Sequence, residues 1–463
     1  MTAAAVDPAL APAAPRSRTY ADEYLALLTL VLGGYAIGGK GFAYLGIAPI
    51  YVGEVTLAAG LPALWYARRG AIRFARSPVA LLLAAFMLFS AVRTVPFLSS
   101  YGIAALRDAA LWGYATFSFI VGAIVVSRPA RLSRLVRRFR RFIPVFLIAV
   151  PVMWPAAIIL RDVAPDWPGT QTAILYTKAA DFLVHLSGIA AFVSVGLAGA
   201  AQQWQSVLLT LTVGLTGFQS RGGLLAFMSG YAVAFVARPR SRTAWQIAVV
   251  TASLVGTLAV TGLEVRFPGL DRAISLQQFV DHARSTLGSS SADDLENTRG
   301  WRLAWWAVIL DYTIGGPYRW MGKGYGVNLA DDDGFQVTDD NSLRSPHNVH
   351  MTVLARSGVI GLALWVALQL AWLRTVRRAR ARARVAGDRF WSSLFTFVIA
   401  YWVAFLVNAT FDVYLEGPMG GIWFWTLFGF GLAAALIYGD GHPETPPLSA
   451  SGQRGQRSRA RAP

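Results

Sequence analysis

The sequence contains no cysteine, so disulfide bonds and thiolate chemistry, including thiolate metal sites, are excluded. It also carries little charge, since only 14% of the residues are Asp, Glu, Lys or Arg, whereas a soluble protein carries about 25%. Hydrophobic residues make up 55% of the chain, and the mean hydropathy is +0.46. This composition is typical of a protein embedded in lipid.

Acidic residues are the scarcer charged kind, with 25 against 42 basic residues and a net charge of +17. The placement of the basic residues indicates membrane topology and contact with anionic lipids, so no nucleic-acid partner is expected. The first 20 residues are rich in Ala and Pro and lack an apolar core, which predicts no cleavable signal peptide. This tail and the basic tail at 439–463 are expected to be disordered and cytoplasmic.

A membrane-spanning helix needs about 20 apolar residues. About twelve stretches qualify, which predicts an all-α polytopic membrane protein. They are 24–39, 47–66, 78–95, 109–126, 142–160, 179–200, 206–220, 222–236, 245–262, 348–373, 391–411 and 419–438. Spans one to nine lie within 21–262 and spans ten to twelve within 348–438, with one large polar segment, 263–347, between them.

The basic residues gather in alternate connections. These are the N-terminal tail, 67–77, 127–142, 237–244, 374–390 and the C-terminal tail, which together hold 27 of the 42 basic residues. Because cytoplasmic loops are enriched in Lys and Arg, both termini are predicted to be cytoplasmic and the 263–347 segment extracytoplasmic. This loop is expected to be partly helical, at 275–287 and 299–313, with a glycine-rich turn at 321–326.

The first group with chemical potential is Ser220-Arg221-Gly222-Gly223, between two apolar spans. Serine can cap the following helix, and a guanidinium beside free helix N–H groups forms an anion site suited to phosphate. The alternative is an arginine that reaches the lipid headgroups, with glycines that serve helix packing.

The second group is Asn297-Thr298-Arg299-Gly300-Trp301-Arg302. With Asn297 or Thr298 as the N-cap, Arg299 would lie at a helix N-terminus, where a cation is unfavourable unless an anion binds there. Arg302, one turn further on, is a weaker candidate for the same role. The alternative is an arginine on a solvated loop.

The third group is Ser345-Pro346-His347-Asn348, which predicts a helix start with serine as cap. A helix N-terminus disfavours imidazolium, so His347 should be neutral and able to act as a general base. His350, one turn on, could share the site, and Asp412 could orient His347 or an acceptor hydroxyl. The alternative for His347 is a residue that only ties the loop to the bundle.

Other polar residues and glycines are expected to have structural roles. The aspartates at 331–333 could bind a divalent cation, but their spacing fits no EF-hand loop, and a solvated turn is preferred. His185, in the middle of a span, is expected to be a hydrogen-bonded core group. Gly358 and Gly361 are expected to allow close helix contact.

Taken in order, these motifs resemble the O-antigen ligase and O-antigen polymerase superfamily of bacterial membrane glycosyltransferases. The matching features are Ser220-Arg221-Gly222-Gly223, Arg299 with Trp301 and Trp305, Gly322-Lys323-Gly-Tyr-Gly326, and Pro346-His347-Asn348 followed by Arg356-Ser-Gly358-Val-Ile-Gly361. The resemblance covers about 205–415, whereas the first 200 residues match only as hydrophobic spans.

The resemblance implies a GT-C-type enzyme of the cytoplasmic membrane with an extracytoplasmic site. Such enzymes move a glycan from a polyprenyl diphosphate to an acceptor hydroxyl on a glycan or glycolipid, and need no metal and no nucleotide sugar. It implies that Arg221 and Arg299 contact the diphosphate and that His347 activates the acceptor. Further residues are expected to bind substrate: Arg302, Gly222, Lys323, Asn348, His350 and Asp412. Ligase, polymerase and protein-glycosylating branches share these residues.

Two other classes of function compete with this one. A transporter or flippase for lipid-linked sugars would suit about twelve spans, but it usually shows related halves and polar groups at mid-membrane. Here no halves are apparent, and the unusual residues lie at the outer rim and in one loop. A non-catalytic scaffold would leave the arginines and His347 without a role.

Overall fold

The computed structural model describes residues 18–170, 172–198, 203–217, 219–238, 244–249, 293–339 and 341–441, with the backbone alone for 203 and 293–299. In these residues, the regular structure is helical apart from a small hairpin in which β1 (Gly46–Ile47) pairs antiparallel with β2 (Ile50–Tyr51). The predicted all-α class is therefore confirmed for the described part of the chain.

The elements of the first half are α1 (Tyr20–Ala43), α2 (Val52–Tyr66), α3 (Arg68–Ala75), α4 (Pro78–Val92), η2 (Val95–Phe97), α5 (Leu98–Tyr101), α6 (Ile103–Gly113), α7 (Thr116–Ser127) and α8 (Ala130–Ile159). Those of the second half are α9 (Ala179–Ser194), α10 (Gln203–Gly217), α11 (Arg221–Ala237), α14 (Asp293–Leu310), η3 (Asp311–Gly315), α15 (Leu329–Asp332), α16 (Val349–Val385), α17 (Arg389–Ala409), η4 (Tyr414–Glu416) and α18 (Pro418–Gly439).

Seven helical stretches of the described residues are long and apolar enough to cross a membrane, and α9 and α11 are shorter apolar helices. The seven are Tyr20–Ala43, Pro78–Tyr101, Ile103–Ser127, Ala130–Ile159, Val349–Val385, Arg389–Ala409 and Pro418–Gly439. The chain is therefore a multi-pass membrane protein, while the count of twelve spans stays a prediction. The ninth predicted stretch, 245–262, lies outside the described residues except for its helical start.

Two predicted spans need correction at their boundaries. The stretch 47–66 is α-helical only from Val52, because the preceding residues form the β1–β2 hairpin. The stretch 109–126 is divided between α6 and α7, which are separated by two residues. Apolar composition located both segments, but it carries no information on where the backbone turns.

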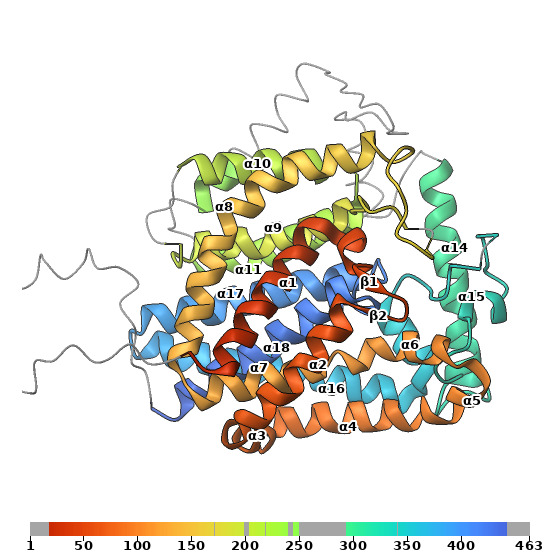
Figure 1. The fold of residues 1–463 in the computed structure, drawn as a ribbon, viewed down its shortest axis with the longest axis horizontal. Helices are drawn as coiled ribbons and strands as arrows, with labels where there is room; N and C mark the ends of the chain where they lie inside the picture. Colours follow the sequence, from red (N-terminus) through yellow and green to blue (C-terminus); the bar gives the residue numbers. More distant parts are fainter. Residues whose placement is uncertain are drawn as a thin grey trace, which may run out of the picture.

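The long helices pack into one bundle. α11 lies against α9 and α17, α18 against α7, and α16 against α17 and α4. In Figure 1, α4, α10 and α17 run along the long axis of the molecule, whereas α14 runs across one end of it. Close packing between helices depends on small residues, since a Cβ on Gly230 in α11 would lie 2.6 Å from the carbonyl oxygen of Ala400 in α17.

At the end of the bundle opposite α14, contacts between polar residues join the connections that are rich in Lys and Arg. Asp22 at the start of α1 pairs with Arg131 (2.8 Å) and Arg134 (2.7 Å) of α8, and Arg73 of α3 pairs with Asp440 after α18. Arg238 after α11 donates to Ser393 of α17 (2.6 Å). The segments that the Lys and Arg pattern assigns to one side therefore do meet at one end of the bundle. That this end faces the cytoplasm stays a prediction.

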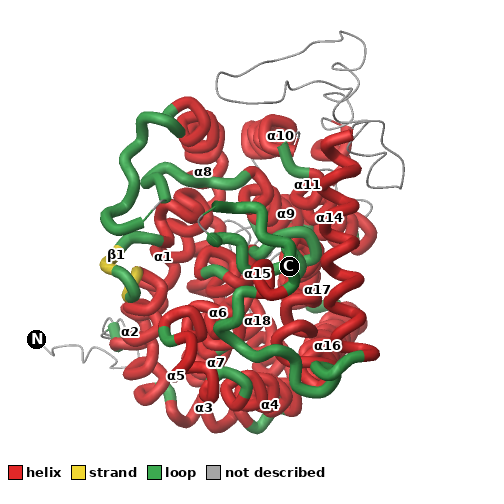
Figure 2. The backbone as a smooth tube through the Cα atoms, turned by 90° about the vertical axis from the view of Figure 1, so that its right-hand side faces the viewer, coloured by secondary structure: helices red, strands yellow, loops and turns green. Residues whose placement is uncertain are grey.

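The other end carries the hairpin, α14 and α15. Figure 2 looks onto this end and shows α14 along one side, with loop segments crossing the ends of the bundle helices. Here the segment before α9, the start of α11 and the turn between α17 and α18 meet α14 and the segment before α16.

Candidate functional site

The start of α11 is as the sequence predicts. Ser220 has an extended backbone, and its Oγ accepts a hydrogen bond from the Gly223 N–H (3.1 Å), so it caps the helix. Arg221 is therefore the first helical residue, and it is partly buried. A Cβ on Gly222 would lie 2.8 Å from the Cβ of Phe411, so the absence of a side chain lets α11 approach the turn that follows α17.

That turn, at Phe411 and Asp412, is where three segments distant in the sequence meet. Arg302 of α14 donates from Nη1 to the carbonyl oxygen of Phe411 (3.2 Å). Lys178, just before α9, donates from Nζ to Oδ1 of Asp412 (3.2 Å). His347, just before α16, has its Nδ1 4.0 Å from the same Asp412 oxygen. We call Lys178, Arg302, His347 and Asp412 the charged cluster.

The predicted start of α16 at Ser345 and Pro346 is wrong. The N-cap is Asn348, whose Oδ1 accepts hydrogen bonds from the backbone N–H groups two and three positions on, at 2.9 and 3.2 Å. The helix therefore begins at Val349. Ser345 is buried and does not cap the helix. His347 thus lies outside the helix, in the segment that enters it.

His347 is held in an unusual backbone conformation. Its φ is +53°, in the left-handed region that residues other than glycine seldom adopt. On one side Trp306 of α14 donates from Nε1 to the carbonyl oxygen of Pro346 (3.0 Å), and on the other Asn348 caps α16. Strain of this kind persists only where the surrounding structure fixes it, and it clusters at functional sites. The conformation fixes the approach of the imidazole to Asp412.

The environment keeps His347 neutral. Burial lowers its pKa to about 4, aided by the charges of Arg302 and Lys178 and opposed by Asp412. Burial alone would raise the pKa of Asp412, but Lys178 and His347 act against it and hold that pKa below its usual range. The structure therefore has a neutral imidazole beside an ionised carboxylate. The helix N-terminus invoked from the sequence is not the main cause.

The prediction for the start of α14 is also wrong. The helix begins at Asp293 rather than near Arg299, so Asn297 and Thr298 lie inside it and not at its start. Asp293 and Asp294 make an acidic first turn, which suits the positive end of a helix. Arg299 lies one turn before Arg302 on the same helix. Its side chain lies outside the described residues.

The structure does not bring Lys323 to the charged cluster. Its ammonium pairs with Asp332 (2.5 Å) and with the buried Asp333, which also accepts a hydrogen bond from Trp305 Nε1 (2.7 Å). The aspartate run, interpreted from the sequence as a solvated turn, is thus partly an anchor for Lys323 and α14. In the described residues, no group of His, Asp and Glu side chains could hold a metal ion.

The glycine-rich turn docks on a break in α16. The N–H of Lys323 donates to the carbonyl oxygen of Ala355 (2.7 Å), and that of Gly324 donates to Arg356 (2.9 Å). Gly358 inside α16 has a φ of +63°, and a Cβ there would lie 2.5 Å from the carbonyl carbon of Trp320. Gly358 therefore does permit a close approach, but to a loop rather than to a helix.

His350 confirms how sharply α16 bends. Its Nδ1 accepts a hydrogen bond from Trp365 Nε1 (3.0 Å). An unbroken helix would separate these two positions by about 22 Å along its axis, which their side chains could not span. The two halves of α16 must therefore be inclined toward each other at Gly358. This hydrogen bond places His350 against the bundle rather than beside Asp412.

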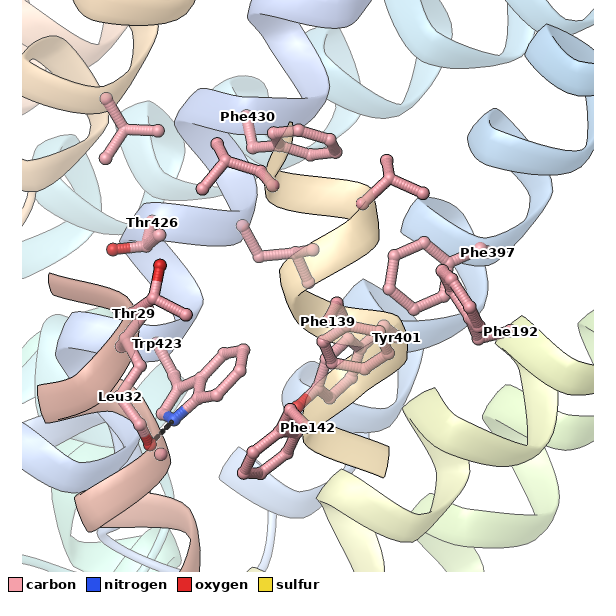
Figure 3. Close-up of a pocket in the computed structure, with 15 residues that line it drawn as sticks. Thr29, Leu32, Phe139, Phe142, Phe192, Phe397, Tyr401, Trp423, Thr426 and Phe430 are labelled. Atoms are coloured by element: carbon pink, nitrogen blue, oxygen red, sulfur yellow. Dashed lines mark hydrogen bonds between the residues drawn. The ribbon is translucent and has the colours of Figure 1, made fainter. Parts of the chain in front are cut away.

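The bundle interior also contains an apolar pocket, shown in Figure 3. Fifteen residues from α1, α7, α8, α9, α17 and α18 line it, Phe142, Tyr401 and Trp423 among them, and none is charged. It is suited to an apolar ligand and not to a diphosphate. Beside it, His185 is hydrogen-bonded to Tyr401 (2.5 Å) and Tyr414 (2.9 Å), as expected for a core histidine.

Sequence reasoning missed Lys178, the residue that pairs with Asp412. A lysine at the edge of an apolar span is most often one that reaches the headgroups, so it gave no distinct signal. Several buried polar groups near these segments have no hydrogen-bond partner among the described residues. They include Nε of Arg302, the carboxylate of Asp181 and the amide of Asn408. Such groups are normally satisfied by water or ligand.

The fold and the charged cluster define a multi-pass helical membrane protein with ionisable groups gathered at one end of its bundle. Residues 206–366 match the family model described as O-antigen ligase. This region, which runs from α10 to the middle of α16, is therefore similar to O-antigen ligases, and the resemblance is confirmed for it. The match includes Arg221, Arg302 and His347 but neither Lys178 nor Asp412. No curated protein matches the chain.

Proposed function

We propose that this protein is a membrane glycosyltransferase. It transfers a glycan from a polyprenyl diphosphate to an acceptor hydroxyl at the outer face of the bacterial cytoplasmic membrane. The reaction inverts the anomeric centre and uses no metal. The family domain at 206–366 implies lipid-linked glycan substrates. The observation that carries the proposal is the neutral His347 beside the ionised Asp412, with Arg302 bound to the adjoining peptide.

The arginines stabilise the leaving group. As the bond between the anomeric carbon and the diphosphate oxygen breaks, its electron pair stays on the diphosphate and negative charge develops there. Fixed cations stabilise that charge most where water is excluded. We assign this role to Arg221 and Arg299, with Arg302 assisting. Arg302 uses one N–H on Phe411, while its buried Nε has no partner among the described residues.

His347 acts as the general base for the acceptor hydroxyl. Its Nδ1 faces Asp412, so a proton on Nδ1 leaves the lone pair of Nε2 available. The acceptor oxygen attacks the anomeric carbon from the face opposite the diphosphate while its proton passes to Nε2. Asp412 then faces the imidazolium that forms. The 4.0 Å separation is longer than a hydrogen bond, and it would have to shorten when substrate binds.

The test is a reconstitution in proteoliposomes with purified polyprenyl-diphosphate-linked glycan and candidate acceptors. We expect joined product, with His347→Ala and Arg299→Ala each losing on the order of 10²–10⁴ in rate. Arg319→Gln is the matched control, because Arg319 is an exposed arginine of the same loop. Near-normal turnover by both alanine variants would remove the catalytic assignment. Movement of the lipid-linked glycan across the bilayer without joining would indicate a flippase.

A gene deletion distinguishes the branches of the family. Loss of a ligase should leave long glycan chains on the carrier, and loss of a polymerase should leave single repeats. Long chains left on the carrier would identify a glycolipid core or a protein as the acceptor. Single repeats would identify the growing glycan as the acceptor.

A further inference from the structure

The outward side of α14 carries an apolar stripe that the proposed reaction does not use. Leu303, Leu310 and Ile314 are 48%, 42% and 48% exposed and follow one another at helical spacing across the end of α14 into η3. Just beyond them, Trp320 is 57% and Met321 39% exposed. Five large apolar side chains left exposed in one region indicate a surface with a partner.

The orientation of α14 is fixed by its other contacts. Trp305 and Ile309 are fully buried against the loop that contains α15. Arg302 and Trp306 contact the bundle end, at Phe411 and at Pro346. At 3.6 residues per turn, the apolar stripe comes next around the helix after Arg302 and Trp306. It therefore borders the side of α14 that meets the bundle.

A second row of exposed apolar side chains lies on α4. On α4, Leu81, Leu88 and Val92 are exposed at helical spacing, as expected for a span in contact with acyl chains. At the end of α4, Arg93 donates to the carbonyl oxygen of Met321 (2.8 Å), so this end of α4 contacts the backbone next to Trp320.

The composition of the junction fits the headgroup region. The guanidinium of Arg319 lies 5.1 Å from the centre of the Trp320 ring. Tryptophan and arginine are the residues that anchor membrane proteins at the boundary between acyl chains and headgroups. α14 itself runs across the end of the bundle, in the direction that a helix lying in that boundary would take (Figure 1).

We propose that α14 is an interfacial helix, with Leu303, Leu310, Ile314, Trp320 and Met321 seated in the phospholipid leaflet at this end of the bundle. The loop segment 293–347 is then not suspended in water above the membrane. The charged cluster lies at headgroup depth, where the phosphates of a lipid substrate are found. The inference does not depend on the proposed reaction, because it concerns only the bilayer.

The absence of native cysteine makes a direct test simple. Single cysteines replace Leu310, Ile314 or Trp320, carry bimane, and are reconstituted in phosphatidylcholine and phosphatidylglycerol nanodiscs. We expect emission to be quenched by lipids with a doxyl group near the headgroup and not by iodide. Leu88→Cys, on the lipid-facing side of α4, should respond most to a doxyl group deep in the acyl chain. Val337→Cys, which is 69% exposed in the same loop, should respond to iodide alone.

Two results would overturn the proposal. Quenching of all three probes by iodide and not by doxyl lipids would place the stripe in water. Protection from both quenchers would place it against protein, and cross-linking between copies would then identify a dimer. Three labelling positions guard against a single variant that does not fold, and each must keep the thermal unfolding midpoint of the parent protein.

Discussion

Replacing Gly322 by alanine should destabilise the protein more than any other glycine substitution in the loop that docks on α16. Gly322 has a φ of +63°, and the new Cβ would lie 2.5 Å from Ser357 N and 2.6 Å from the carbonyl oxygen of Arg356. The left-handed backbone costs an alanine about 1–2 kcal/mol. Overpacking against rigid backbone costs about 1–3 kcal/mol more. We therefore expect a loss of roughly 2–5 kcal/mol in the free energy of unfolding.

Two matched glycines separate these contributions. Gly334 has a φ of +77° with nothing within 4 Å of a Cβ, so Gly334→Ala should show the backbone cost alone. Gly300 lies within α14, also with open space around it, so Gly300→Ala should be neutral or should stabilise by about 0.5–1 kcal/mol. The expected order of unfolding midpoints is Gly300→Ala highest, then Gly334→Ala, then Gly322→Ala.

The assay is thermal unfolding in detergent, followed by tryptophan fluorescence and by loss of the monodisperse peak. Equal midpoints for Gly322→Ala and Gly334→Ala would refute the reasoning, because they would mean that the loop does not press on the break in α16. A loss for Gly322→Ala that Gly358→Ala does not share would also contradict it, since the two glycines lie on the two sides of one contact.

Further predictions concern the charged cluster and the loop. Since burial lowers the pKa of His347 to about 4 and the neutral imidazole is the base, glycosyl transfer should be flat near neutral pH and fall as the pH approaches about 4. Asp412 raises that pKa, so Asp412→Asn should move the acid limb of the pH profile to lower pH and reduce the rate at the plateau. If the acid limb does not move, Asp412 does not influence the pKa of His347. Lys323→Met leaves the buried Asp333 without its cation and should cost about 3 kcal/mol, part of which Lys323→Met with Asp333→Asn should restore in the same unfolding assay. In intact cells, a cysteine at Val337 should react with an impermeant maleimide, and one at Val385 only after permeabilisation; the reverse result would invert the predicted topology.

Local sequence signals predicted one helix start and failed at two others for physical reasons. At α11 a single capping serine stands before two glycines, with nothing nearby to compete. At α16, Ser345 and Asn348 both could cap, and the structure uses Asn348, three residues further on. At α14 the sequence predicts a start near Arg299, whereas the helix begins upstream at the acidic pair Asp293 and Asp294. Where two nearby side chains could cap, the local sequence does not decide between them.

The pairing of distant motifs was likewise invisible in the sequence. Gly322 and Gly358 each appeared as ordinary flexible or packing glycines, yet both adopt positive φ because the backbones they belong to meet. The positions of Arg302, His347 and Asp412 could be named in advance, since polar residues at the rim of an apolar bundle are few. Their meeting at one turn could not, because it depends on how α14 crosses the bundle end.

The bend in α16 connects these observations. A straight helix would carry its N-terminus on along the bundle axis, whereas the break at Gly358 inclines the first two turns. The glycine-rich turn holds that break from one side, and Lys323 and Asp333 tie the same turn to α14. α14 in turn supplies Arg302 to the Phe411 carbonyl and Trp306 to Pro346. His347 and Arg302 are therefore placed by one continuous set of contacts, so damage to the loop should reach the base and the anion site together.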